Sequence, residues 1–146
     1  GAATIAEASL AQKNIALEMI LDGVHVSDEI LQEVLASGDK RTILITDSMS
    51  AAGSVDGNYS IGSLEVVVVN GVARLTSNHS LAGSTLTMDK AFNNFLQVNK
   101  SITDCVYAAS TLPAKTLGLK AVGELAVGKK AHVLEHLDSK ITVVAS

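Results

Sequence analysis

Two short apolar runs flank an amphipathic segment in the first third of the chain. Residues 15–21 (IALEMIL) are apolar apart from one glutamate and end in an Asp-Gly turn, so we interpret them as a strand that runs on to residues 24–26. Ser27 precedes two acids and then apolar residues at helical spacing, which predicts a capped helix. Residues 42–46 (TILIT) predict a buried strand that stops at Asp47. The order strand, helix, strand favours a parallel βαβ unit.

The middle of the chain changes to a different pattern. Residues 48–63 are rich in Ser, Gly, Ala and Asp and predict a long loop. Residues 64–69 and 72–75 are rich in β-formers, and the Asn-Gly between them is the strongest short-range signal for a hairpin. Residues 76–86 predict a second polar loop. We therefore expect a hairpin near residues 64–75, set between loops.

Helices followed by strands are predicted for the rest of the chain. Residues 87–98 place apolar side chains on one stripe, and residues 102–109 form a second helical pattern. Pro113 lies near the first turn of a third helix. Residues 131–137 and 141–145 return to a β pattern. The fold class expected for the whole is α/β.

The composition narrows the class of protein. The 146 residues suffice for one domain, 47% are apolar and the mean hydropathy is +0.33, which argues against disorder. The net charge is −4 and basic residues run no longer than a pair, so we expect no nucleic acid partner. No apolar stretch reaches the roughly 18 residues of a membrane span, so we expect no membrane partner. Cys105 has no partner for an intrachain disulfide, and we interpret it as a buried helix residue.

Polar side chains follow both predicted parallel strands. Asp47 comes directly after the second strand and before a loop rich in Gly and Ser. A carboxylate at the carboxyl end of a parallel strand can move a proton in hydrolysis, but it can equally cap the loop. His25 follows the first strand and, taken alone, fits a packed or surface histidine. Two such groups on neighbouring strands face one shared mouth, which favours a functional site.

Three further motifs carry weaker signals. Leu81-Ala82-Gly83-Ser84 precedes a helix, where free amides bind anions or carbonyl oxygens, although an ordinary capped helix explains the motif as well. His132 and His136 share one face of a predicted strand. With no third ligand nearby, we favour a solvated face over a metal pair. His79 is a loop residue with no partner in the sequence.

Five segments of the chain form a recognisable combination. They are DGVHV at 22–26, TDSMSAAG at 46–53, LAGSTLTM at 81–88, PAKTLGL at 113–119 and GELAVGK at 123–129. Together they resemble segments of N-acetylglucosamine-6-phosphate deacetylases, a family of the amidohydrolase superfamily. The resemblance departs in the segment after residue 128, where His132 stands in place of an acid. Any one segment is weak, but their combination is specific.

The resemblance implies a fold and a division of the chain. Residues 1–120 would be the last strands and helices of a (β/α)8 TIM barrel, and residues 121–146 the C-terminal strands of a small β-sandwich domain. The function implied is hydrolysis of the acetamide of N-acetylglucosamine-6-phosphate to glucosamine-6-phosphate and acetate, in amino-sugar catabolism. Asp47 would act as general base on a metal-bound water and then as general acid.

The resemblance also assigns binding residues, a cofactor and partners. His25 would contact the phosphorylated sugar, and Leu81, Ala82, Gly83 and Ser84 would line the pocket. The metal would be a divalent ion, zinc or similar, whose ligands we expect upstream, with no metal ligand in this chain. The partners expected are an amino-sugar phosphate and, in a homodimer, a second copy, and the location expected is cytoplasmic.

A closed barrel needs about 250 residues, so 146 residues are expected to be an incomplete portion that is inactive alone. Two alternatives stay open. One is a folded fragment without catalytic function, and the other is a related metal-dependent amidohydrolase with another amide substrate.

Overall fold

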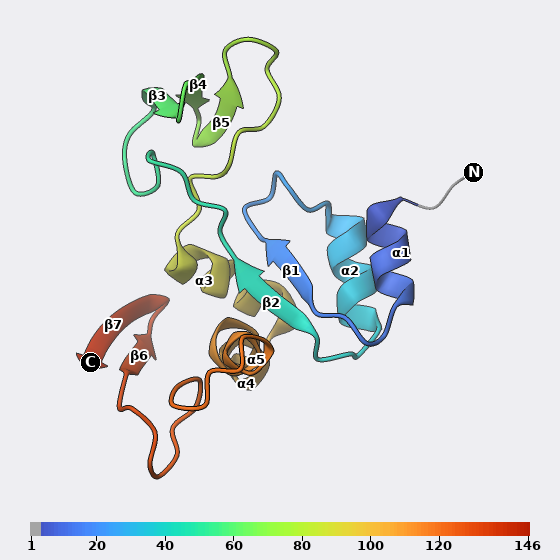
Figure 1. The fold of residues 1–146 in the computed structure, drawn as a ribbon, viewed down its shortest axis with the longest axis vertical. Helices are drawn as coiled ribbons and strands as arrows, with labels where there is room; N and C mark the ends of the chain where they lie inside the picture. The colour runs from blue at the N-terminus through green and yellow to red at the C-terminus, as the bar shows by residue number, and fades with distance from the viewer. Residues whose placement is uncertain (1–3) are drawn as a thin grey trace.

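The first half of the chain forms the strand, helix and strand that its hydrophobic pattern predicts. The structure is a computed structural model that describes residues 4–146. Strands β1 (Leu17–Ile20) and β2 (Thr42–Ile45) pair in parallel, and their arrowheads point the same way in Figure 1. Helix α2 (Asp28–Ala36) connects them, and the Ser27 hydroxyl accepts a hydrogen bond from its first turn. The carboxyl ends of both strands therefore meet at one edge.

Two features of this half differ from the prediction. The strand does not continue through residues 24–26, which form bends, because the backbone turns at Gly23 with a φ of 77°. Helix α1 (Ile5–Ala11) lies in a segment for which no element was predicted, and Thr4 and Glu7 form a capping box at its start. No residue of α1 is buried and only Ser9 and Leu10 are half-buried, so the sequence of the helix carries no strong periodic signal.

A buried arginine holds α1 and the following loop to the start of β2. Arg41 is 7% exposed, and its guanidinium donates to the carbonyl oxygens of Leu10 at 2.7 Å, Gln12 at 2.8 Å and Ser9 at 3.0 Å. These include carbonyls at the end of the helix, which have no partner within the helix itself. The contact lies at the amino end of the parallel strands, away from the edge described above.

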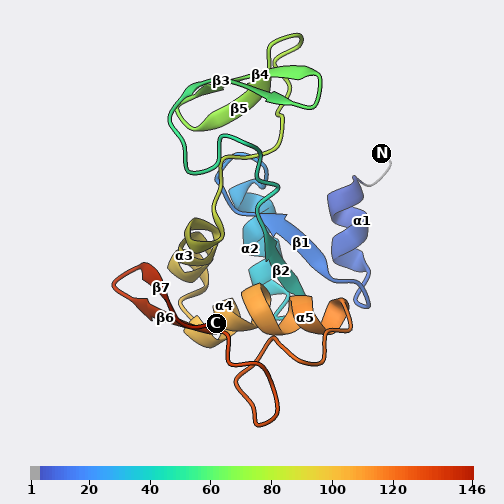
Figure 2. The same cartoon turned by 60° about the vertical axis from the view of Figure 1, so that its left-hand side comes forward.

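Three antiparallel strands form a small separate sheet beyond that edge. Strand β4 (Leu64–Val69) and strand β5 (Val72–Leu75) form the hairpin predicted from the Asn-Gly turn. Strand β3 (Gly57–Ile61) pairs with β4, so the prediction of a loop for residues 48–63 is wrong at its end. The sequence of β3 is polar, and pairing with the valine-rich β4 makes it a strand. Figure 2 shows this sheet standing above β1 and β2.

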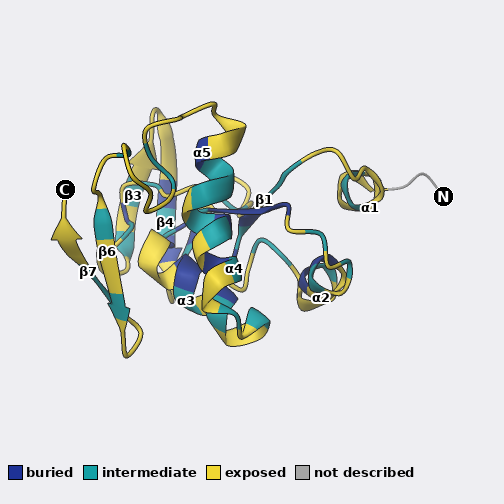
Figure 3. Ribbon diagram, turned by 90° about the horizontal axis from the view of Figure 1, so that it is seen from below, coloured by how far each residue is buried: buried dark blue, intermediate teal, exposed yellow. Residues whose placement is uncertain are grey.

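A helical layer covers one face of β1 and β2. Helix α3 (Met88–Asn99) is followed by α4 (Ile102–Val106), a π-helical segment (Tyr107–Thr111) and α5 (Leu112–Thr116). The last three elements follow one another without a break, where the sequence predicted two separate helices. Dark buried residues gather between this layer and the strands in Figure 3. The buried core consists of Met19, Leu21, Leu31, Val34, Leu44, Phe92, Phe95, Cys105 and Ala108. Burial raises the pKa of the Cys105 thiol to about 11, and neighbouring Asp104 adds to the rise.

The chain ends in an antiparallel hairpin of β6 (Val133–Leu137) and β7 (Lys140–Ala145). The hairpin rests on α3 through His136, whose Nε2 lies 2.9 Å from Asn93 Oδ1 and whose ring centroid is 5.3 Å from that of Phe92. The solvated face predicted for this histidine is therefore wrong, because the side chain packs on a helix far away in sequence. No helix in the described part of the chain is long and apolar enough to span a membrane.

Candidate active site

The parallel pairing brings two predicted site residues to the same edge of the sheet. His25 lies in the segment that follows β1, and Asp47 lies two residues after the last residue of β2. The carboxyl edge of a parallel sheet is where ligands and catalytic groups collect in α/β folds. Both segments therefore start from the same edge of the sheet, and they are fixed there by different means. That the two side chains face one shared mouth stays a prediction.

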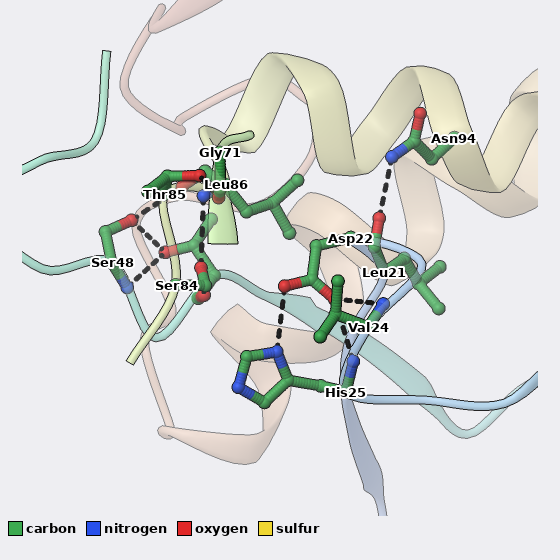
Figure 4. Close-up of polar contacts among 11 residues, drawn as sticks. Leu21, Asp22, Val24, His25, Ser48, Gly71, Ser84, Thr85, Leu86 and Asn94 are labelled. Atoms are coloured by element: carbon green, nitrogen blue, oxygen red, sulfur yellow. Dashed lines mark hydrogen bonds and ion pairs between the residues drawn. The ribbon is translucent and has the colours of Figure 1, made fainter. Parts of the chain in front are cut away.

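The segment after β1 is a self-contained turn built on one carboxylate. Asp22 Oδ1 accepts hydrogen bonds from the amides of Val24 at 2.9 Å and His25 at 3.0 Å. Its second oxygen, Oδ2, lies 2.8 Å from Nδ1 of the His25 ring (Figure 4). Gly23 supplies the left-handed backbone that this tight turn requires. Four consecutive residues thus fix the position of the histidine.

The Asp22 carboxylate is ionised in this setting. Burial opposes its charge, but hydrogen bonds from the His25 and Val24 amides and from the His25 ring together hold the pKa of Asp22 below its ordinary value. The side chains of Asp22 and His25 are 16% and 18% exposed, so both are largely shielded while the ring still reaches the surface. The pair is therefore an anionic carboxylate beside a partly accessible imidazole.

A side chain from the helical layer fixes the start of this turn. Asn94, in α3, donates from Nδ2 to the carbonyl oxygen of Leu21 at 2.7 Å (Figure 4). Leu21 is 5% exposed and belongs to the core. The turn therefore leaves the sheet from an anchored residue. Nothing in the sequence around Asn94 indicated this contact across 73 positions.

Asp47 lies on an exposed loop whose backbone is constrained. Its φ is 49°, in the left-handed region that residues other than glycine and asparagine or aspartate seldom adopt. Its carbonyl oxygen accepts a hydrogen bond from the Ser84 amide at 2.8 Å, and the Ser84 carbonyl accepts one from Met49 at 2.9 Å. The side chain of Asp47 faces solvent on a backbone that a distant segment holds in place.

The hydroxyl of Ser84 completes this contact between segments. It donates to the Thr46 carbonyl oxygen and accepts a hydrogen bond from the Leu86 amide at 3.1 Å. In return, the Ser48 hydroxyl donates to the Leu86 carbonyl at 2.8 Å (Figure 4). We call these contacts between residues 46–49 and residues 83–86 the Ser84 clamp. It joins the loop after β2 to the segment that leads from the small sheet to α3.

The four residues predicted to line a pocket differ in how far their side chains are buried. Ala82 and Ser84 are 7% and 2% exposed, so their side chains support the segment from within. Leu81 and Gly83 are only partly buried, and for them contact with substrate stays a prediction. Gly83 has a φ of 63°, and a Cβ there would lie 3.1 Å from the Asp47 carbonyl oxygen. The close approach of the two segments therefore requires glycine.

The residues described do not form a metal site by themselves. Among residues 4–146, no group of three or more His, Cys, Asp or Glu side chains lies close enough to hold a metal ion. A cavity of about 410 Å³ lies at the other end of β2, where Lys40 and Asp104 form a 2.8 Å ion pair. Its lining includes neither His25 nor Asp47. That cavity is therefore separate from the residues at the carboxyl edge.

Comparison with curated proteins identifies several relatives. A protein of Escherichia coli K12, named as a candidate N-acetylgalactosamine-6-phosphate deacetylase, is 39% identical over 138 residues, 93% of this chain and 81% of that protein. The N-acetylglucosamine-6-phosphate deacetylases of Vibrio furnissii and Bacillus subtilis are 37% and 38% identical, over 87% and 86% of this chain. The chain spans only 32% of the length of each of these two relatives. No model of a protein family matches the chain.

Solved structures of the same enzyme resemble the chain. The N-acetylglucosamine-6-phosphate deacetylase of Thermotoga maritima superposes with a TM-score of 0.79 at 39% identity, covering 87% of this chain and 35% of that one. The Mycobacterium smegmatis enzyme, solved as an aspartate-to-alanine mutant in complex with N-acetyl-D-glucosamine-6-phosphate, gives a TM-score of 0.81 at 37% identity. It covers 92% of this chain and 37% of the other. The mixed α/β arrangement is therefore shared with a part of these proteins.

Proposed function

We propose a function from one premise: the chain belongs to the N-acetylglucosamine-6-phosphate deacetylase family. The proposal is that the chain supplies one side of a site that hydrolyses the acetamide of N-acetylglucosamine-6-phosphate to glucosamine-6-phosphate and acetate. The observation that carries it is the exposed Asp47 carboxylate at the carboxyl edge, beside the segment that holds His25. This is the hydrolase and deacetylase role that the sequence predicts.

Asp47 would handle the proton in this reaction. Its carboxylate accepts a proton from the water whose oxygen bonds to the acetyl carbon. The same carboxyl then gives the proton to the sugar nitrogen as the carbon–nitrogen bond breaks, which releases acetate and the amine. The Ser84 clamp supports this role because it fixes the backbone on either side of Asp47 without using its side chain. His25 would bind the phosphate of the substrate.

We extend the proposal to the architecture of the whole protein. The strands β1 and β2 would be the last two of a TIM barrel, and residues 121–146 would belong to the small β-sandwich, with residues 1–120 in the barrel domain. Support comes from the parallel register of β1 and β2 and from the separate hairpin of β6 and β7. A pair of parallel strands leaves both outer edges unpaired, and a continuing barrel would cover them.

The cofactor, partners and location are proposed from the family resemblance. A divalent metal, zinc or similar, would be held by ligands outside this chain, since the residues described do not make a site for one. The small-molecule partner would be an amino-sugar phosphate, the assembly a homodimer and the location cytoplasmic.

A second substrate follows from the names of two relatives. Two relatives named for N-acetylgalactosamine-6-phosphate are 39% identical to this chain, and the chain covers 81% of the length of one of them. The Thermotoga maritima enzyme, named for N-acetylglucosamine-6-phosphate, is also 39% identical, so sequence identity does not separate the two sugars. The two sugars carry the same acetamide and phosphate and differ in configuration at one hydroxyl. The groups assigned to Asp47 and His25 are common to both substrates, so this chain's two site residues serve either one.

A chimera tests the proposal directly. The matching C-terminal segment of the Bacillus subtilis relative would be replaced by this chain, and acetate release would be measured on both sugar phosphates with added zinc. We expect turnover, a loss of about 10³-fold or more in kcat with Asp47→Asn, and a raised KM with His25→Ala. A folded chimera whose turnover survives Asp47→Asn would contradict the role of Asp47.

The same assay on the chain alone separates the open alternatives. We expect a folded circular dichroism spectrum and no turnover, because the chain provides no metal site of its own among its described residues. Turnover by the chain alone that Asp47→Asn abolishes would contradict the expectation that the rest of the protein is needed. A chimera inactive on both sugars but active on another amide would favour the related amidohydrolase.

A further inference from the structure

The turn after β1 contains one contact more than its backbone needs. A carboxylate that only caps a turn needs one oxygen, and Asp22 Oδ1 already accepts both backbone amides, from Val24 and His25. Its other oxygen, Oδ2, is directed at Nδ1 of the His25 ring at 2.8 Å. The second contact adds nothing to the backbone of the turn. Its effect falls on the imidazole.

We infer that Asp22 is a positioning residue, whose carboxylate fixes the His25 ring so that Nε2 is the nitrogen presented to an anionic group of the substrate. The anion, a phosphate, rests on the proposed function. The orientation of the ring rests only on the geometry of the turn.

The chemistry of the pair determines where the ring carries its protons. An ionised carboxylate can only accept hydrogen bonds, so a 2.8 Å contact with Asp22 requires a proton on Nδ1. The ring then takes its second proton at Nε2, and in that state it is a cation that donates toward an anion. The partly exposed ring presents this nitrogen on the side away from Asp22 (Figure 4). One carboxylate thus sets both the ring's tautomer and its direction.

The rest of the segment keeps this geometry in place. The Asn94 side chain anchors the carbonyl of Leu21 at 2.7 Å, immediately before Asp22. Gly23 allows the backbone to return within three residues. The pair is therefore preformed in the chain itself and does not depend on substrate for its orientation. Preorganisation of this kind reduces the entropy lost on binding.

Nuclear magnetic resonance of the ring nitrogens tests the inference on the chain as it is. The sequence contains four histidines, so His25→Gln would identify the signals of this ring in a ¹⁵N-labelled sample. In the neutral ring we expect a protonated Nδ1 and an unprotonated Nε2. A wild-type chain with the proton on Nε2 instead would overturn the inference without any variant.

The isosteric variant Asp22→Asn gives the opposite expectation. The asparagine oxygen can still cap the two amides, so its NH₂ group faces Nδ1 and forces that nitrogen to accept. We therefore expect the neutral tautomer to invert, with the proton moving to Nε2. The control is Asp28→Asn, which removes a negative charge in the first turn of α2. In this variant the proton of the neutral His25 ring should stay on Nδ1. Retention of the Nδ1 proton in a folded Asp22→Asn chain would show that Asp22 does not set the ring.

Inorganic phosphate probes the anion, with chloride at equal ionic strength as reference. We expect phosphate to shift the Nε2 signal and to leave Nδ1 in place in the wild-type chain. In Asp22→Ala, which frees the ring, we expect both nitrogens to shift. No Nε2 shift, or an equal shift in chloride, would overturn the anion-binding part. None of these signals depends on turnover, so a negative result here can be told apart from a negative result in the deacetylation assay.

Discussion

The two segments at the carboxyl edge are positioned in contrasting ways. After β1, His25 is fixed by Asp22, three residues away, through contacts within a single turn. After β2, the backbone around Asp47 is fixed by Ser84 and Leu86, and the contacts reach across as many as 38 positions. His25 is therefore positioned by residues next to it in the chain, whereas the position of Asp47 depends on the folding of the sheet that lies between the two halves of the Ser84 clamp.

The contrast has a structural cause. The chain between the two halves of the Ser84 clamp forms β3, β4 and β5, whose own small core consists of Ala51, Val66, Val68, Ala73 and Ala82. This sheet returns the chain to the loop after β2 because Ala82 donates to the Ala73 carbonyl at 3.1 Å. The sheet therefore contributes to the site indirectly, by delivering residues 83–86. Changes within the clamp should affect stability more than changes within the local turn.

The largest effect is expected from Gly83→Ala. A methyl group there would lie 3.1 Å from the Asp47 carbonyl oxygen and 3.3 Å from the Met49 side chain, on a backbone with a φ of 63°. We expect a loss of about 2–4 kcal/mol in the free energy of unfolding, from the strained backbone together with overpacking. Urea denaturation followed by circular dichroism would measure it.

Gly38→Ala is the matched control for this change. Its φ is 66°, nearly the same, but nothing lies within 4 Å of the added methyl group. We expect a loss of only about 1 kcal/mol from the backbone conformation. Equal losses for the two variants would mean that the close approach of the clamp adds nothing.

Ser84→Ala should have the next largest effect. It leaves the Thr46 carbonyl and the Leu86 amide without their partner at a site that is 2% exposed. Leaving buried polar groups unpaired costs about 1–3 kcal/mol, and hydrogen exchange at the Leu86 amide should accelerate. Ser80→Ala, at an exposed serine whose hydroxyl donates to Asn78 Oδ1, should change stability by less than about 0.5 kcal/mol. Similar losses for both serines would argue against the clamp.

Asn94→Ala tests the anchor of the local turn. The variant removes the hydrogen bond to the Leu21 carbonyl, and we expect a loss of about 1 kcal/mol in the free energy of unfolding. Gln97→Ala, at an exposed position on the same helix, serves as control. If thermal unfolding showed no difference between them, the turn would be held by its own contacts alone.

The smallest effect is expected in how the free energy of unfolding changes at acidic pH. The folded pKa of Asp22 lies below its unfolded value of about 3.9, so its contribution to stability is fully present above that value. The contribution is lost as the pH falls through the folded pKa. We therefore expect Asp22→Asn to flatten the fall of stability below about pH 4. Chemical denaturation at a series of acidic pH values would check this, and an unchanged slope would contradict it.

The sequence predicted most elements of regular structure and both strand-end residues. The βαβ order, the Asn-Gly hairpin and the helix at residues 87–98 all carry local signals that the structure bears out. Strand β3 escaped prediction because its polar residues become a strand only against β4. The packing of His136 on Phe92 escaped for the same reason, since its partner lies on another element.

The sequence by itself determined the features of the structure whose contacts lie between residues close together in the chain. Asp22-Gly23-Val24-His25 contains its own acceptor, its own glycine and its own imidazole, so the contacts that fix this turn lie within four consecutive residues. The Asp-Gly pair signalled the turn, although we expected the strand to continue through residues 24–26. Only the tertiary structure decided how Asp47 is held. Ser84 looked like a pocket or capping residue, and its buried hydroxyl instead bonds a strand-end carbonyl. The physical reason is that hydrogen bonds between distant segments depend on the path of the chain between them, which no local pattern encodes.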